Sequence, residues 1–153
     1  MCVVNLKRNM GLSYLFNYDL MKQLNGDKQM ADVWQLPAIG RWEKSCGKHP
    51  TQKPLGVLAR LIQASTKPGA WILDPFSGSA TTGIAANLLD RCYLGLEMEI
   101  DFLAMGKARR EEIENADIRS NYLERLAKAK IILPPDNFFV ADETENDYNV
   151  PWL

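Results

Sequence analysis

The sequence predicts an α/β protein built on a parallel sheet. Helical and strand patterns alternate between residues 54 and 131, and two short apolar runs, residues 70–76 and 91–98, each lead into a helix. Such alternation is typical of parallel strands joined by helices. Only two strands are recognisable, so we expect a partial sheet that lacks several strands of a complete one.

The composition suits a single globular domain. The chain has 153 residues, of which 46% are hydrophobic and 24% charged, enough to bury a core. No apolar run is long enough to cross a bilayer, and the N-terminus lacks the apolar region of a signal peptide. The three cysteines, Cys2, Cys46 and Cys92, are too few and too scattered for a disulfide framework. We therefore expect a cytoplasmic protein that does not contact a membrane.

Secondary-structure signals are weak at the N-terminus and become strong at Pro54. Residues 12–18 suggest a strand, and Asn-Gly-Asp at residues 25–27 suggests a turn. Residues 32–53 hold two prolines and two glycines without a sustained period, which indicates a loop. Pro54 suits the first turn of a helix, which Thr-Lys-Pro-Gly at residues 66–69 would end. One face of this helix carries Leu55, Leu58, Leu61 and Ile62.

The remaining elements alternate regularly. The strand at residues 70–76, expected to be buried, precedes a helix at residues 81–89. The second strand, residues 91–98, precedes a helix at residues 100–115 that becomes strongly charged. A last helix covers about residues 120–131, before Pro-Pro stops it.

Charge is distributed unevenly along the chain. Residues 1–67 carry ten Lys and Arg against four Asp and Glu, whereas residues 68–153 carry eight against fifteen. The densest basic cluster consists of Arg41, Lys44, Lys48 and Lys53. It suits a polyanionic partner, although a solvated face would have the same composition. Residues 132–153 form an acidic segment that we expect to be a flexible tail.

The end of the first strand carries the features of a ligand site. Ligands of open α/β sheets bind beyond the carboxyl ends of the strands. The small residues at 77–80 allow close approach to the backbone, and the following helix presents amide N–H groups to a carboxylate. Asp74 is an acceptor for an ammonium group, and Glu97, at the end of the second strand, can hold the hydroxyls of a ribose. Together these groups describe an amino-acid nucleoside, such as S-adenosylmethionine (SAM).

Two other interpretations of this stretch are weaker. A dinucleotide site needs glycines at G-x-G-x-x-G, whereas only Gly78 and Gly83 fall in the window, and a pyrophosphate fits poorly beside Asp74. An ordinary strand-to-helix turn leaves the Asp-Pro pair and the run of small residues unexplained.

Two motifs resemble a known enzyme family. Residues 74–83, "DPFSGSATTG", resemble the cofactor motif of the amino-methylating DNA methyltransferases, and residues 47–54, "GKHPTQKP", resemble the motif that precedes it in the β-type order of that family. "DVWQLP" and "YLGLEMEIDFLAMGKARR" are also similar, so the resemblance covers about residues 32–115. It implies a Rossmann-like SAM-dependent methyltransferase fold of which this chain has a part.

The resemblance also implies roles for individual residues. It implies a cofactor pocket lined by Asp74, Phe76, Gly78, Ser79 and Thr81, with Glu97 on the ribose and Thr51, Gln52 or Lys53 at the methionine end of SAM. Ala80 stands where the family has glycine, and we expect its methyl group to narrow the gap between backbone and cofactor. The basic residues Arg41, Lys44 and Lys48 would contact DNA.

A metal site is a rival interpretation of His49. Cys46 and His49 have a familiar spacing, but the chain has no second pair of this kind and no other histidine. Because a zinc site needs about four ligands, we expect no metal and interpret His49 as a hydrogen-bonding residue at the mouth of the pocket.

The catalytic motif of the family is not recognisable. The family holds the flipped base with a polar residue followed by Pro-Pro and an aromatic residue. The one Pro-Pro pair, in "ILPPDNFF", has leucine before it and aspartate after it, and it follows the cofactor motif where the β-type order places the catalytic motif first. We therefore predict no catalytic residue in this chain.

The sequence then favours the C-terminal, SAM-binding half of a site-specific DNA methyltransferase that needs a complementary half. Residues 1–31 would be the edge of the missing target-recognition and catalytic half, residues 32–131 the cofactor-binding domain, and residues 132–153 the tail. Adenine N6 is the expected target, with cytosine N4 as the alternative. A truncated or regulatory cofactor-binding module, an interaction protein without cofactor, and a small-molecule or protein methyl acceptor stay open. The expected partners are DNA and either a complementary half or further copies of the chain.

Overall fold

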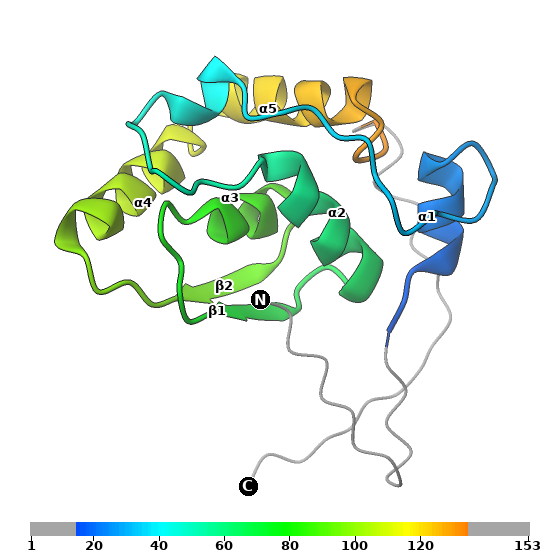
Figure 1. Ribbon diagram of the computed structural model, residues 1–153, viewed down its shortest axis with the longest axis horizontal. Coiled ribbons are helices and arrows are strands. Elements are labelled where there is room, and N and C mark those ends of the chain that lie inside the picture. The colour runs from blue at the N-terminus through cyan, green and yellow to red at the C-terminus, as the bar shows by residue number, and fades with distance from the viewer. Residues whose placement is uncertain (1–14, 135–153) are drawn as a thin grey trace, which may run out of the picture.

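The computed structural model describes residues 15–134 and shows an α/β fold (Figure 1). Its elements, in chain order, are α1 (Tyr18–Leu24), η1 (Arg41–Lys44), α2 (Leu55–Ser65), β1 (Trp71–Asp74), α3 (Thr81–Leu88), β2 (Cys92–Gly95), α4 (Ile100–Glu112) and α5 (Ala116–Lys128). Within residues 15–134, no helix is both long enough and apolar enough to span a bilayer.

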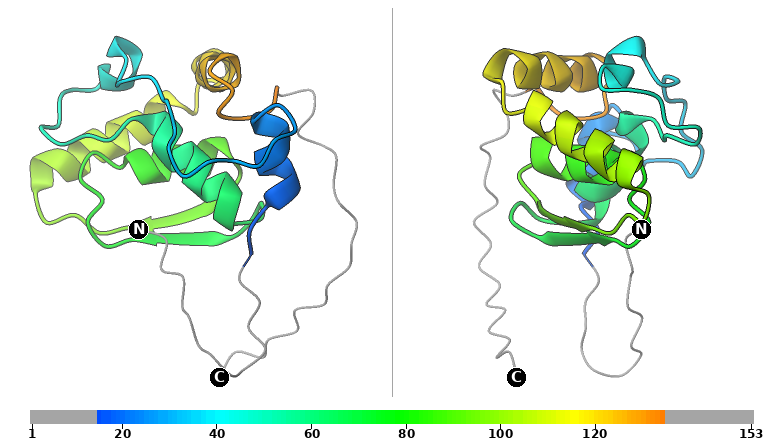
Figure 2. Two further views of the ribbon diagram at one scale, coloured as in Figure 1. Left: turned by 45° about the vertical axis from the view of Figure 1, so that its right-hand side comes forward. Right: turned by 90° about the vertical axis from the view of Figure 1, so that its left-hand side faces the viewer.

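The two strands pair in parallel, as the alternating pattern predicts. Trp71 lies opposite Cys92 and Asp74 opposite Gly95, with α3 as the connection between the strands. Helices α2, α3 and α4 lie on one side of the strands, and α5 lies beyond them (Figures 1 and 2). The carboxyl ends of β1 and β2 therefore meet at one edge of the sheet.

One hydrophobic core joins these layers. It is built from β1, α2, α3, α5 and the chain segments that follow α4 and α5, and most of its side chains are almost completely buried. Its members are Leu55, Ala59, Ile62, Ile72, Ile84, Ala85, Ala86, Leu88, Leu89, Ile113, Tyr122, Leu126, Ile131 and Ile132. The core holds α2 and α3 against a single face of the sheet.

Most predicted helices are confirmed, and the deviations are at their ends. Helix α2 begins directly after Pro54 and stops before Thr66, and α3 and α4 lie within their predicted ranges. Helix α5 begins four residues earlier than predicted, because the Asn115 side chain accepts hydrogen bonds from the N–H groups of Asp117 and Ile118. Asparagine is a common N-cap residue, so the sequence already indicated this earlier start of the helix.

The strand predicted at residues 12–18 is wrong for its described part, since Tyr18 already begins α1. Asn17 docks onto the end of α2 instead: its N–H donates to the Ala64 carbonyl at 2.9 Å, and its side-chain amide donates to the Thr66 carbonyl at 3.1 Å. Met21 and Leu24 then pack on Ala64. The predicted turn at residues 25–27 is confirmed, with positive φ angles at residues 26 and 27. Residues 12–14 lie outside the described part of the chain, as does the tail after residue 134.

The prediction that β1 is buried holds for one face only. Ile72 and Asp74 are buried, whereas Trp71 is 74% and Leu73 50% exposed. Leu61, expected on the core face of α2, is also 43% exposed. Both corrections have the same reason. The sequence shows that a side chain is hydrophobic, but it does not show which element of the fold covers that side chain.

Candidate functional site

The site is built where β1 and β2 end. Beyond the strands, the backbone ladder continues: Leu96 N–H donates to the Asp74 carbonyl and Ser77 N–H to the Leu96 carbonyl, both at 2.9 Å. The Asp74 side chain is buried, and its Oδ1 accepts the N–H of Phe76 at 3.1 Å. The two loops that carry the predicted site residues are therefore held side by side.

Glu97 joins the two loops directly. Its Oε2 accepts the Gly78 N–H at 2.7 Å, and its Oε1 accepts the Glu99 N–H at 2.9 Å. These backbone N–H groups, that of Glu99 first, lower the pKa of Glu97, so the carboxylate is ionised at neutral pH. Each oxygen keeps a further lone pair for a ligand hydroxyl.

The loop that leads into α3 needs its small residues. Gly78 has φ of +51°, and a Cβ there would lie 3.1 Å from His49 Nε2. Ser79 and Thr81 are buried, with their hydroxyl oxygens 3.2 Å apart. Phe76, by contrast, is 85% exposed. Glycine thus allows both the turn and the close approach of the upstream loop.

Arg109, on α4, is a site residue that the sequence interpretation missed. Its Nη1 donates to the Ser79 carbonyl at 2.5 Å and to Thr81 Oγ1 at 3.0 Å, and the side chain is buried. Burial lowers its pKa, although a guanidinium keeps its charge. The available signal was its spacing, because Arg109 shares the inner face of α4 with Gly106, three residues before it, and with Ile113, four residues after it.

The upstream motif reaches the same place through His49. Its ring packs against Phe102 of α4, with centroids 4.1 Å apart, and its Nδ1 accepts the Thr51 N–H at 3.2 Å. Together with the approach of its Nε2 to Gly78, this places His49 of the upstream motif against the loop after β1. Cys46, its rival metal partner, contacts Glu112 Oε2 at 3.5 Å instead, and burial raises the pKa of its thiol.

Gln52 and Glu43 anchor the upstream loop. Gln52 is buried and donates from Nε2 to the Glu43 carbonyl at 2.8 Å. The buried Glu43 carboxylate in turn accepts the N–H of Gly40 at 3.0 Å and that of Leu55, the first residue of α2, at 2.7 Å. The side chains of Thr51 and Lys53, by contrast, are exposed. Gln52 therefore has a structural task in addition to the predicted one at the cofactor.

The methyl group of Ala80 points elsewhere than expected. A Cβ added at Gly106 of α4 would lie 2.9 Å from the Ala80 Cβ, so this methyl group faces α4. Ala80 has φ of +56°, a conformation that glycine adopts more easily. The departure from the family pattern therefore affects backbone strain and the contact with α4.

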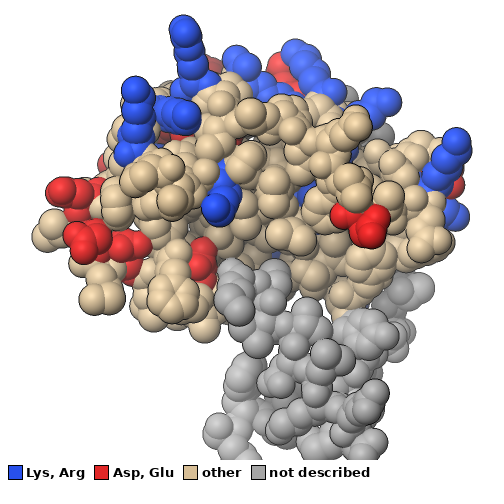
Figure 3. Space-filling view, in the orientation of Figure 1, with Lys and Arg blue, Asp and Glu red and all other residues tan. Residues whose placement is uncertain are grey.

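The residues predicted to contact DNA are all exposed. Arg41 and Lys44 lie in η1, and Lys48 lies in the loop that leads to His49. Figure 3 shows Lys and Arg side chains along the edge formed by η1 and α5, whereas Asp and Glu gather where α4 begins. This face thus has a largely basic edge along η1 and α5, and DNA contact stays a prediction.

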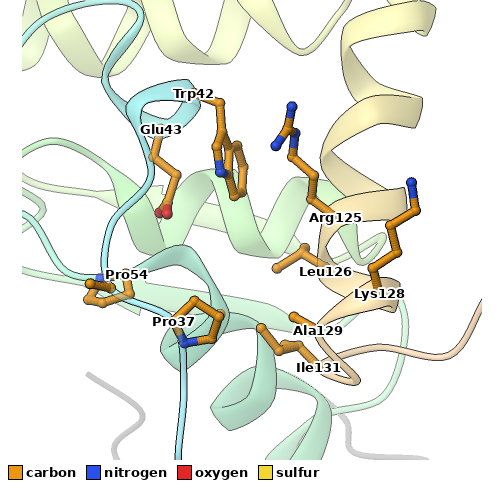
Figure 4. Close-up of a pocket in the computed structure, with 11 residues that line it drawn as sticks. Pro37, Trp42, Glu43, Pro54, Arg125, Leu126, Lys128, Ala129 and Ile131 are labelled. Carbon is orange, nitrogen blue, oxygen red and sulfur yellow. The ribbon is translucent and has the colours of Figure 1, made fainter.

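A pocket of about 390 Å³ lies away from this site. It opens between the loop before η1, the start of α2 and the end of α5 (Figure 4). On its wall, Trp42 meets Tyr122 edge to face at 4.7 Å between ring centroids, and the Arg125 guanidinium lies 5.4 Å from the Trp42 ring centroid. None of the predicted cofactor residues lines this pocket.

Comparisons with known proteins show which family the chain resembles. A family model described as DNA methylase matches residues 5–108. The chain is 52% identical over 126 residues to Type II methyltransferase M2.MboI of Moraxella bovis, across 82% of this chain and 46% of that protein. It is 51% identical over 98 residues to Type II methyltransferase M2.DpnII of Streptococcus pneumoniae, across 64% and 37%. The chain thus spans less than half the length of these curated relatives.

A solved structure supports the fold assignment. The crystal structure of the M1.HpyAVI-SAM complex matches with a TM-score of 0.51 and 32% identity, over 65% of this chain and 45% of that one. The predicted fold class, a partial Rossmann-like methyltransferase fold with a reduced parallel sheet, is confirmed.

Proposed function

The chain belongs to the family of amino-methylating DNA methylases, and from this membership we propose that it is the SAM-binding part of a site-specific DNA methyltransferase. It would supply the cofactor half of an enzyme that methylates an exocyclic amine of DNA, with adenine N6 as the favoured target. A complementary part would supply the base-holding motif. The shares of 46% and 37% of the two relatives' lengths support this division.

The contact between Glu97 and Gly78 carries the proposal. It joins the loop after β1 to the acid after β2, so one site presents a buried Asp74, an oriented carboxylate and the N-terminus of α3. This set of groups fits SAM chemically. Asp74 would accept from the ammonium group, and Glu97 would accept from the ribose hydroxyls.

The remaining residues would orient the ligand. The backbone of Gly78, Ser79 and Thr81 would lie against it, and Phe76 would cover it. Thr51 and Lys53 would reach its methionine end, together with the unpaired Oε1 of the buried Gln52. When bound, SAM supplies the electrophilic methyl group, and the acceptor amine comes from the DNA.

DNA contact and location are part of the same proposal. The exposed side chains of Arg41, Lys44 and Lys48 would neutralise phosphates next to the site. Residues 32–131 would form the cofactor-binding domain, and residues 1–31 the edge of the missing half. A cytoplasmic location is supported by the odd number of scattered cysteines.

Two alternatives share the cofactor site. A half that methylates cytosine N4 would differ in the complementary part that holds the base. A truncated or regulatory module would bind SAM without transferring its methyl group. The pairing of "HPTQKP" with "DPF" favours the adenine target, and the missing catalytic motif keeps the second alternative open.

Calorimetric titration of the full chain with SAM tests the cofactor site. Glu97→Gln should weaken binding about tenfold or more, because a charged acceptor is lost and the new amide opposes the Gly78 N–H. Glu99→Gln is the matched control, because Glu99 is exposed and only its backbone N–H takes part. Equal affinity of wild type and Glu97→Gln would contradict the assignment.

The pH dependence gives a second readout. A depressed pKa means that the charged form of Glu97 is favoured in the fold. The contribution of this carboxylate to SAM affinity is therefore complete above its ordinary pKa of about 4.5. It should be lost only as the pH falls through the lowered pKa. SAM affinity measured from pH 8 downward should therefore show no weakening from Glu97 at mildly acidic pH.

Methyl transfer distinguishes the alternatives. Methyl-labelled SAM and DNA are incubated with the chain alone, and with the chain together with the part of the Moraxella bovis relative outside the alignment. Label in DNA only in the mixture supports a complemented enzyme, and the modified base identifies adenine or cytosine. SAM binding without label in either reaction supports the regulatory module.

A further inference from the structure

The pocket between η1 and α5 is mostly apolar and separate from the cofactor loops. Its volume of about 390 Å³ is typical of pockets that take a ligand. Its walls include Pro37 and Pro54 on the upstream loop, Trp42 on η1, and Leu126 and Ile131 at and after the end of α5. Such walls favour an apolar or aromatic occupant, because they make dispersion contacts and gain from the exclusion of water.

Two cations flank these apolar walls. Arg125 and Lys128 both project from α5 (Figure 4), and both are exposed. The ion pair of Lys128 with Glu124, at 3.6 Å, is also exposed and therefore weak. Among the described lining residues Glu43 is the one acid, and its buried carboxylate already accepts two backbone N–H groups. This side of the pocket therefore suits an occupant that carries carboxylates.

The chain that follows the pocket wall has the complementary composition. Residues 135–153 lie outside the described residues, and they hold five Asp and Glu but no Lys or Arg. Their first stretch, residues 136–142, reads "DNFFVAD", with two phenylalanines and a valine between two aspartates. We call residues 136–142 the acidic-aromatic segment. Its apolar centre and charged ends match a pocket with apolar walls and flanking cations.

The acidic-aromatic segment is close enough to reach the pocket. Leu133, near the end of the described chain, packs with Ala64 at the end of α2, whereas Gly56 at the start of α2 lines the pocket. The eight residues between these two positions span about 12 Å of helix. Phe138, five residues after Leu133, can extend about 17 Å from it. The segment can therefore turn back along α2 to the pocket.

We propose that the acidic-aromatic segment docks in this pocket of its own chain. Its two phenylalanines lie against the apolar walls, and its two aspartates pair with Arg125 and Lys128. A DNA backbone would use the two cations but leave the apolar walls exposed to water, so it matches the pocket less well. The docked segment also covers part of the basic edge along η1 and α5, where it competes with DNA. The competition rests on the proposed function, whereas the docking does not.

Disulfide trapping in the full chain tests the docking. The three cysteines are replaced by serine, and Asn137→Cys reports where the segment lies. Ala38→Cys, on the pocket wall, should form a disulfide with it in oxidised glutathione about tenfold faster than Gln23→Cys does. Gln23 is exposed on α1 beside Leu24, which packs in the same cluster as Leu133, so a segment that does not dock would meet it more readily. Equal rates, or a faster reaction with Gln23→Cys, would overturn the docking.

Matched substitutions show which contacts hold the segment. Replacing both of its phenylalanines by serine should slow the Ala38→Cys disulfide about tenfold, because their burial is lost. Tyr148→Ser, which removes an aromatic side chain outside the segment, should leave the rate unchanged. Arg125→Gln combined with Lys128→Gln should slow it about threefold, whereas Lys107→Gln, on α4, should not. An unchanged rate in the serine variant would show that the pocket does not hold this segment.

The size of the trapped product identifies the chain that supplies the segment. A disulfide within one chain forms at a rate that does not depend on protein concentration. Disulfides that join two chains, with a yield that rises with concentration, would assign the pocket to the segment of a second copy and overturn the docking within one chain.

DNA binding tests the competition. Fluorescence anisotropy of a labelled duplex at low salt compares the disulfide-locked chain with the same chain after reduction. The locked chain should bind about fivefold more weakly, because its carboxylates neutralise cations of the basic edge. Equal affinities would overturn the competition. Absence of duplex binding by the reduced chain would instead contradict the DNA contact of the proposed function, and the trapping rates would still decide the docking.

Discussion

The two faces of the sheet differ although they come from the same four-residue strands. On the inner face, Ile72 is 4% exposed and packs among α2 and α3, whereas Leu73, the next residue, is 50% exposed on the outer face. The inner face has its cover within the described chain, and the outer face does not. Residues of equal hydrophobicity thus have different energetic roles.

This difference separates the side chains that stabilise the described fold from those that the described chain leaves exposed. The inner face carries the core and, through α3 and α4, holds the loop after β1 in place. The outer face has no such cover among residues 15–134, so its apolar side chains stay exposed. Substitutions that distinguish the two faces test this division.

The largest contrast is expected between neighbours on β1. Ile72→Ala should lower the free energy of unfolding by about 2–4 kcal/mol, because it leaves a cavity in the core. Leu73→Ala should lower it by less than about 1 kcal/mol, because the side chain is half solvated. Urea denaturation followed by circular dichroism measures both. Equal losses would mean that the outer face is already covered in the isolated chain.

The contrast continues along α4 with two adjacent arginines. Arg109→Met should cost about 2 kcal/mol and weaken SAM binding, because the Ser79 carbonyl and the Thr81 hydroxyl lose a charged donor. Arg110→Met should cost less than about 0.5 kcal/mol, since the one side-chain pair of Arg110 within residues 15–134 is an exposed i,i+4 pair with Glu114 at 3.1 Å. Thermal melting and calorimetry of both variants test this. Identical SAM affinities would exclude a positioning role for Arg109.

Tyr93 offers a pH test of the inner face. It lies between the outward-facing Cys92 and Leu94, and burial raises its pKa to about 12. In the unfolded chain the phenol of Tyr93 ionises near pH 10, so between about pH 10 and 12 the fold keeps this phenol neutral. The contribution of the neutral Tyr93 to the free energy of unfolding is complete below pH 10 and is lost as the pH rises from about 10 to about 12. In urea titrations at rising pH, Tyr93→Phe should lose less stability than wild type, whereas Tyr18→Phe, an exposed control, should follow wild type.

The smallest expected effect concerns Ala80 and Gly106, at the border of the site. Ala80→Gly should stabilise the chain by no more than about 1 kcal/mol, because it relieves a positive φ while it increases the entropy of the unfolded chain. Gly106→Ala alone should destabilise it, because the two Cβ atoms would lie 2.9 Å apart. Combining the two should remove this penalty. Additive effects in the double variant would mean that the methyl groups do not meet.

Much of the fold and the site could be predicted from local patterns. The order of strands and helices follows from short apolar runs and breakers, and the site follows from small residues between Asp74 and Thr81. The contact between Gly78 and Glu97 was predictable in outline, because parallel strands bring their carboxyl ends to one edge. Arg109 could not be found in this way, since its role depends on α4 packing against the start of α3.

By itself the sequence determined the family, the order of the elements and the chemistry of the loop after β1, because each depends on residues close together in the chain. Only the tertiary structure decided that Leu73 faces outward, that residues after Asn17 form a helix docked on α2, and that the Ala80 methyl group meets α4. The physical reason is that burial depends on which distant element covers a side chain, and period and propensity describe only the side chain itself.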